Sequence, residues 1–177
     1  MRWYWLDKFE VFHSGVKSQA IKSISLGEDH MHDHFPRYPV MPHSLALEGI
    51  AQTAGLLICE HYHYMQKVVL AKINKAVFHD LAYPGDTLVY RAQVERFDPE
   101  GTVASATSMK RLASGEEIPH AEVEMLFANL DESYSGKELF SLRDYRNLMV
   151  ALRMYDVAVQ EDGVTPLEEP EEFRNLG

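Results

Sequence analysis

Apolar and polar residues alternate along several short stretches of the chain, as they do in β-strands that bury one face. The first two stretches are 9–12 and 20–26, and Ser14-Gly15 between them is typical of a turn. Four later strands are predicted at 68–78, 87–97, 102–112 and 121–130. Short turns rich in glycine, proline, serine and aspartate separate the later strands, which favours antiparallel neighbours.

Residues 44–64 have the length and apolar spacing of one long helix. Within 45–58 apolar side chains surround nearly the whole helix, which predicts burial on most sides. The segment 27–42 before this helix shows neither the alternation of a strand nor the spacing of a helix, and we expect a loop there. One long helix among roughly six strands indicates an antiparallel α+β domain.

The charge pattern divides the chain into a domain at 1–130 and a C-terminal extension at 131–177. In the extension we predict an amphipathic helix over about 141–158, beginning at a capping box of Ser141 and Asp144. We expect its apolar stripe to pack on the domain, with binding to a partner protein as the alternative. The acidic run near the end is predicted to be a solvated tail.

Composition narrows the function classes. The 177 residues carry 27 acidic and 17 basic side chains, a net charge of −10, which argues against a general nucleic-acid binder. The single cysteine, Cys59, rules out a disulfide framework. The longest apolar run is too short to span a membrane and the N-terminus does not resemble a signal peptide, so we expect a cytoplasmic protein without membrane insertion.

Two polar residues interrupt the apolar helix on one face. Glu48 and Gln52 are four residues apart and therefore share a side of the helix. A carboxylate in apolar surroundings is unfavourable unless it is paired or protonated, so a chain that keeps one usually has a use for it. Glu48 is thus a candidate acid, with an exposed helix face or a hydrogen-bonded core pair as the alternative.

Histidines and prolines crowd into the segment before this helix. His30, His32 and His34 alternate, a spacing that would place three rings on one side of an extended segment as metal ligands. No cysteine pair and no His-Glu-x-x-His helix supplies a fourth group. We therefore expect no metal site.

The first turn of the helix adds a third candidate element. Pro42 stands close to the start of the helix, so the free N–H groups of the first turn lie near His43 and Ser44. Such N–H groups can hold a developing oxyanion. A base at His34, an acid at Glu48 and this helix N-terminus would together require no cofactor.

The run from His34 to Gln52 resembles the signature of β-hydroxyacyl-acyl carrier protein dehydratases of the FabZ type, within the FabA/FabZ-like family. It contains a His-Phe-Pro loop, a Pro-x-Met-Pro segment, a glutamate fourteen residues after the histidine and a glutamine four residues beyond. Lys75–Phe78 and Pro84–Asp86 are similar to the family's next strand and turn. The resemblance covers roughly residues 6–130.

The resemblance implies a hot-dog fold, in which a curled antiparallel sheet wraps a long helix. It also implies a homodimer, or a trimer of dimers, with active sites at the subunit interface. His34 of one subunit and Glu48 of the other would be catalytic. Gln52 would support the carboxylate, and the backbone N–H of His43 would face the thioester oxygen.

The implied substrate is a 3-hydroxyacyl thioester on the phosphopantetheine of acyl carrier protein, which loses water to give a trans-2-enoyl thioester in fatty-acid or related lipid biosynthesis. Residues of the loop before the helix are candidates for contact with this substrate: Phe35, Pro36, Arg37, Tyr38 and Met41. Hydrolysis of an acyl thioester, and binding of an acyl chain or carrier without catalysis, are the alternative functions.

Arg37 and His43 stand where the family usually has glycine. A backbone donor survives any side chain except proline, so His43 keeps its N–H, while its ring would narrow or polarise the tunnel mouth. Docking of an acidic carrier protein needs a basic patch. The available basic residues are Arg37, Lys72, Lys75, Arg91, Lys110 and Arg111.

Overall fold

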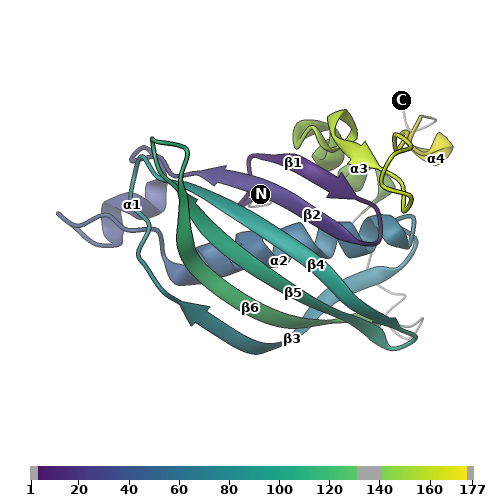
Figure 1. Ribbon diagram of the computed structural model, residues 1–177, viewed down its shortest axis with the longest axis horizontal. Helices are drawn as coiled ribbons and strands as arrows, with labels where there is room; N and C mark the ends of the chain where they lie inside the picture. The colour runs from purple at the N-terminus through teal and green to yellow at the C-terminus, as the bar shows by residue number, and fades with distance from the viewer. Residues whose placement is uncertain (1–3, 131–140, 175–177) are drawn as a thin grey trace.

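The computed structural model describes residues 4–130 and 141–174. In these residues one seven-stranded sheet, in the order β3-β6-β5-β4-β2-β1-β7, curls around a long helix (Figure 1). The strands are β1 Lys8–His13, β2 Lys17–Ser23, β3 Lys67–Phe78, β4 Thr87–Asp98, β5 Gly101–Arg111, β6 Glu117–Leu130 and β7 Ala158–Val159. The helices are α1 Asp29–Asp33, α2 His43–His61, α3 Leu142–Ala151 and α4 Glu171–Arg174, with a 3-10 turn, η2, at Met154–Asp156.

Helix α2 lies in the hollow of the sheet, and its buried side is mostly apolar, with Thr53 and Glu60 as buried polar residues. Ile50, Leu57 and Ile58 are fully buried there. Gly49 has to be a glycine, because a Cβ at this position would lie 2.5 Å from the carbonyl oxygen of Trp5 and 2.6 Å from the ring of Tyr90. The close approach of helix and sheet therefore depends on a missing side chain.

The predicted α+β architecture is confirmed, with differences in detail. All six expected strands and the long helix are present, and the first six strands pair antiparallel. Strand β2 ends at Ser23, earlier than expected, and the expected loop 27–42 contains the short helix α1. The two-residue strand β7, parallel to β1, was not predicted, because two residues carry no periodicity.

The expected helix 141–158 is shorter than predicted. Its capping box is present, since the Asp144 N–H donates to the Ser141 hydroxyl (3.2 Å) and the Asp144 carboxylate accepts from the Ser141 N–H (3.0 Å). The helix ends at Ala151 because the next residues bind the sheet: the carbonyl of Leu152 accepts the Phe9 N–H at 2.9 Å. Arg153 then adopts a left-handed conformation, φ 55°, and the chain leaves the helical path.

The apolar stripe of α3 packs on the core, as expected. Tyr145, Met149 and Leu152 belong to the same hydrophobic cluster as Phe9 and Leu57. One continuous core therefore includes residues from both sides of the boundary predicted near residue 130, and the division into two parts stays a prediction. Within the described ranges, no helix has the length and hydrophobicity needed to cross a membrane.

Candidate active site

Glu48 and Gln52 are joined on one side of α2. The Gln52 side-chain amide donates to Oε1 of Glu48 at 2.9 Å, and Oε1 of Gln52 accepts the Trp5 N–H at 2.9 Å. Gln52 is thereby anchored to the N-terminal segment and orients the carboxyl group. In the single chain the sheet covers the other side of α2 and Glu48 is exposed, which corresponds to the alternative of an exposed helix face.

A groove with a volume of about 380 Å³ runs along this side of α2, and we call it the α2–α3 groove. Its floor is formed by α2 residues Glu48, Ala51, Gln52, Gly55, Leu56 and Cys59. Residues at the start of β3, including Val68 and Leu70, form one wall, and α3 forms another. The only ionisable carboxyl group in this lining is that of Glu48, at one end of the floor.

His34 lies elsewhere in the same chain. It follows α1, and its imidazole stacks on the ring of Phe35 with a centroid distance of 4.3 Å. Its carbonyl accepts the Val40 N–H at 3.0 Å, which helps to hold the loop. None of the residues lining the α2–α3 groove comes from the loop 34–42. A single chain therefore does not bring the expected base and acid into one cavity.

The candidate substrate-loop residues separate into two groups. Phe35, Pro36, Arg37 and Tyr38 are exposed, and the Tyr38 hydroxyl lies 2.7 Å from that of Tyr83. Met41, in contrast, is fully buried in the core, so its side chain does not line the exposed loop.

The first turn of α2 presents free N–H groups. The N–H groups of Leu45 and Ala46 both donate to the carbonyl of Pro42, at 3.0 and 3.1 Å. Those of His43 and Ser44 donate to no backbone carbonyl in the described parts of the chain. They are therefore available to an oxyanion, as the position of Pro42 predicts.

The side chain of His43 is part of an aromatic cluster that the sequence did not predict. Its ring stacks on Phe78 with centroids 4.1 Å apart and an interplanar angle of 7°, and it meets His120 edge-on at 6.3 Å. His120 is buried and bonds the Ser108 hydroxyl through Nδ1 at 2.9 Å. Burial, with a smaller contribution from His43, lowers the pKa of His120 to about 4, so the ring is neutral.

Pro119 is the sequence signal that would have drawn attention to His120. Proline has no backbone N–H to donate to a neighbouring strand, so inside a strand it marks a sheet edge or an irregularity in the strand pairing. The register between β5 and β6 shifts between Ser108 and Met109, opposite this proline. The irregularity places His120 among the buried residues.

The alternating histidines do not form a metal centre in the described residues, where no group of three or more potential ligands is placed to hold an ion. His30 instead packs edge-on against Trp5, with centroids 5.1 Å apart. Burial is the main cause of the lowered pKa of His30.

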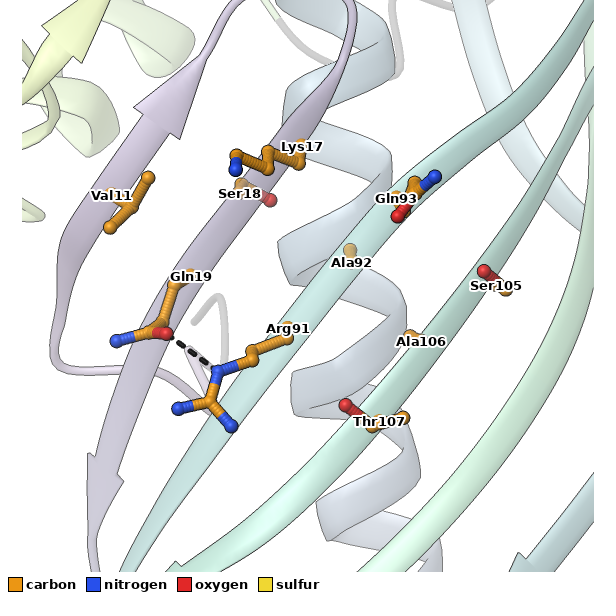
Figure 2. A pocket seen from close by; sticks show the side chains of 10 residues that line it. All are labelled: Val11, Lys17, Ser18, Gln19, Arg91, Ala92, Gln93, Ser105, Ala106 and Thr107. Carbon is orange, nitrogen blue, oxygen red and sulfur yellow. Dashed lines mark hydrogen bonds between the residues drawn. The ribbon is translucent and has the colours of Figure 1, made fainter.

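A second hollow, of about 360 Å³, lies on the outer face of the sheet and is separate from these residues. Figure 2 shows α2 behind the strands that form it, and the hydrogen bond between Arg91 Nε and Gln19, at 2.7 Å. Its lining includes small side chains such as Ala92, Ser105 and Ala106. No candidate catalytic residue contributes to it.

Residues 5–122 match the FabA-like domain family. The chain belongs to this family. It is 37% identical to the 3-hydroxyacyl-acyl-carrier-protein dehydratase FabZ of Desulforamulus reducens, over 70% of this chain and 84% of that protein. It is 34% identical to the FabZ dehydratase of Petrotoga mobilis, over 62% of this chain and 76% of that protein.

Solved structures support the fold. A thioesterase family protein from Silicibacter pomeroyi has a TM-score of 0.56 at 15% identity, covering 70% of this chain and 83% of that one. An acyl-CoA hydrolase from Staphylococcus aureus, in complex with butyryl coenzyme A, has a TM-score of 0.54 at 17% identity, covering 66% of this chain and 67% of that one. The predicted hot-dog fold is confirmed, and likeness at this identity concerns the fold alone.

One departure from the FabA-like pattern has a conformational consequence. Arg37 has a φ of 70°, in the left-handed region where glycine is favoured. A residue with a Cβ in this region costs roughly 1–2 kcal/mol relative to its preferred conformations. Arg37 therefore holds a left-handed backbone conformation and places an exposed cation in the loop before α2.

Proposed function

We propose that this protein is a hydro-lyase that converts 3-hydroxyacyl thioesters, carried on the phosphopantetheine of acyl carrier protein, into trans-2-enoyl thioesters. The observation that carries the proposal is the Trp5–Gln52–Glu48 chain of hydrogen bonds. It holds a carboxyl group on the open side of α2, in a protein of the FabA-like family that is similar in sequence to FabZ dehydratases.

In the proposed reaction the imidazole of His34 removes the α-proton of the substrate. The enolate oxygen accepts the N–H of His43 at the start of α2, where the helix dipole favours negative charge. Glu48, in its protonated form, gives its proton to the departing hydroxyl group, which leaves as water while the C2–C3 double bond forms. Proton exchange with solvent then restores neutral His34 and protonated Glu48.

The proposal includes a homodimer, because His34 and Glu48 of one chain lie apart. Strand β3 is twelve residues long and forms one edge of the sheet. It exposes three large apolar side chains, Leu70, Ile73 and Val77. Pairing of this edge with a second copy would bury them, and the partner subunit would supply its histidine loop. A partner on this side would also cover Glu48 and exclude water from it.

The charge pattern also restricts where an acidic carrier protein would dock. Lys75, Arg91, Lys110 and Arg111 each form an ion pair with a carboxylate of the same chain. Arg37 and Lys72 form no ion pair with any described residue. We therefore propose these two exposed cations as the contacts for the carrier.

Turnover of a 3-hydroxyacyl thioester on acyl carrier protein tests the proposed function. Enoyl absorbance should increase in step with loss of substrate, while no free thiol is released. Release of thiol without enoyl product would instead identify a thioesterase. Binding without either product would identify a non-catalytic acyl-binding protein and end the dehydratase proposal.

A further inference from the structure

The α2–α3 groove continues well beyond Glu48. Cys59 follows Glu48 by eleven positions of α2, which corresponds to about 16 Å along the helix axis. Polar side chains on the floor, Glu48 and Gln52, stand at one end, and the floor beyond them is formed by Gly55, Leu56 and Cys59. Burial raises the pKa of the Cys59 thiol to about 11, so the far end of the floor is uncharged.

Tyr145 and Leu148 of α3, together with Leu152 directly after the helix, form the opposite side of this groove. The Tyr145 hydroxyl lies 3.6 Å from Sγ of Cys59, and both residues are buried, so they meet at the far end of the floor. The ring of Tyr145 also packs on that of Tyr64, with centroids 5.2 Å apart. Figure 1 shows α3 beside β1, near the end of α2.

Helix α3 is held in this position at both ends. The capping box of Ser141 fixes its start, and the bond from the Phe9 N–H to the Leu152 carbonyl fixes its end to β1. Met149, on the side facing the core, is fully buried. The wall that α3 forms is therefore a built part of the fold.

We propose that α3 forms the outer wall and the far end of the site for the acyl chain, and thereby limits the chain length that the protein accepts. The groove fits an amphipathic ligand whose reacting end lies at Glu48 and whose hydrocarbon tail lies against Leu56, Leu148 and Leu152. Its volume of about 380 Å³ is within the usual range of small-molecule sites. The identity of the ligand rests on the proposed function.

Leu148 is the residue best suited to test this wall. It lines the groove and is only half-buried, so a larger side chain there can project into the groove without displacing the core. Val150, on the same helix, is 54% exposed and does not line the groove. Leu148→Trp and Val150→Trp are therefore a matched pair, with Leu148→Ala as a variant that widens the groove.

The experiment measures calorimetric affinity for saturated acyl pantetheine amides of increasing chain length, which can be neither dehydrated nor hydrolysed as thioesters. In the wild type, each methylene that enters the groove should tighten binding about fourfold, until the chain reaches Tyr145 and the affinity stops rising. Leu148→Trp should reach this plateau at a shorter chain and bind the longest chains at least about tenfold more weakly. The shortest chains should bind it as before, and Val150→Trp should match the wild type.

An unchanged length profile in Leu148→Trp, with thermal unfolding showing a folded protein, would overturn the proposal. If Leu148→Trp does not fold, Leu148→Ala is the deciding variant. The proposal then requires that each added methylene increases the affinity of Leu148→Ala less than that of the wild type, or that its affinity stops rising at a longer chain. A shift in oligomeric state without a shift in length profile would assign the groove to a second copy of the chain. Length-dependent binding without dehydration would contradict only the proposed reaction, whereas dehydration with no effect of Leu148 would contradict only the role of α3.

Discussion

The two edges of the sheet differ in the length and the exposure of their outermost strands. At one edge, β3 runs for twelve residues and exposes Leu70, Ile73 and Val77. At the other, β1 is covered by the two-residue strand β7, which belongs to the C-terminal extension. Long apolar edges invite pairing with another chain, whereas short covered edges prevent it. The C-terminal residues therefore close one edge of the sheet, and the other edge is the one at which the proposed second copy would pair.

The largest loss of activity is expected from changes to His34 and Glu48, which pairing of two β3 edges would bring together. Glu48→Gln keeps the volume of the side chain but cannot donate an acidic proton, and His34→Ala removes the base. Each homodimer should lose dehydration by on the order of 100-fold or more. Turnover per folded subunit is the measurement.

A mixture of these two variants tests whether the site is shared. After joint unfolding and refolding, about half of the dimers should be mixed, and each mixed dimer has one site with an intact His34 and an intact Glu48. Activity should return to about a quarter of the wild-type level. Refolding each variant alone is the control. A mixture as inactive as its parents would place both residues in one chain.

The next prediction concerns the β3 edge itself. Ile73→Asp would place like charges near each other in a paired edge, so dimer dissociation should become at least about tenfold more favourable, with a matching loss of activity at low protein concentration. Thr107→Asp, at an exposed position on the inner strand β5, is the control. Sedimentation measures both variants. An unaltered dimer in Ile73→Asp would exclude this edge as the interface.

A smaller effect on activity is expected at the covered edge. Met149→Ala removes a fully buried side chain of α3 and should lower the free energy of unfolding by about 2–5 kcal/mol. Because β3 is unaffected, the dimer and the turnover of short-chain substrates should persist under conditions where the protein is folded. Urea unfolding and sedimentation provide the two measurements, and Val150→Ala is the control. Loss of the dimer would show that the extension also supports pairing.

The sequence predicted the fold well because its signals are local. The alternation of apolar and polar residues identified the strands. Helical spacing alone placed Glu48 and Gln52 side by side, and the hydrogen bond of 2.9 Å between them confirms it. The exposure of Glu48 was left open as an alternative, since an apolar helix does not reveal which side the sheet leaves open. The cluster of Phe78 and His120 was missed because it joins distant segments through an irregular register.

The roles of the site residues stay predictions for a related reason. A single chain separates His34 from the groove that contains Glu48, so the expected constellation depends on contacts between chains. Helix periodicity likewise predicted that α3 packs on the domain, but it could not show that Leu148 faces a groove and Met149 the core.

The smallest effect is expected for His43→Gly. His43 is the first residue of α2, and its ring stacks on Phe78 at the end of β3. The backbone N–H remains, so the proposed oxyanion contact is kept. Nε2 of His43 is buried without a hydrogen-bond partner among the described residues, so removing the ring breaks no polar contact of this atom. Loss of the stacking should lower stability by about 0.5–1.5 kcal/mol, while kcat/KM stays within about threefold of wild type or rises. His43→Phe, which keeps an aromatic ring without the polar atom, is the matched variant. If the glycine variant is folded but inactive, the imidazole itself takes part in the chemistry, and the proposed mechanism, in which only the backbone of His43 acts, is wrong.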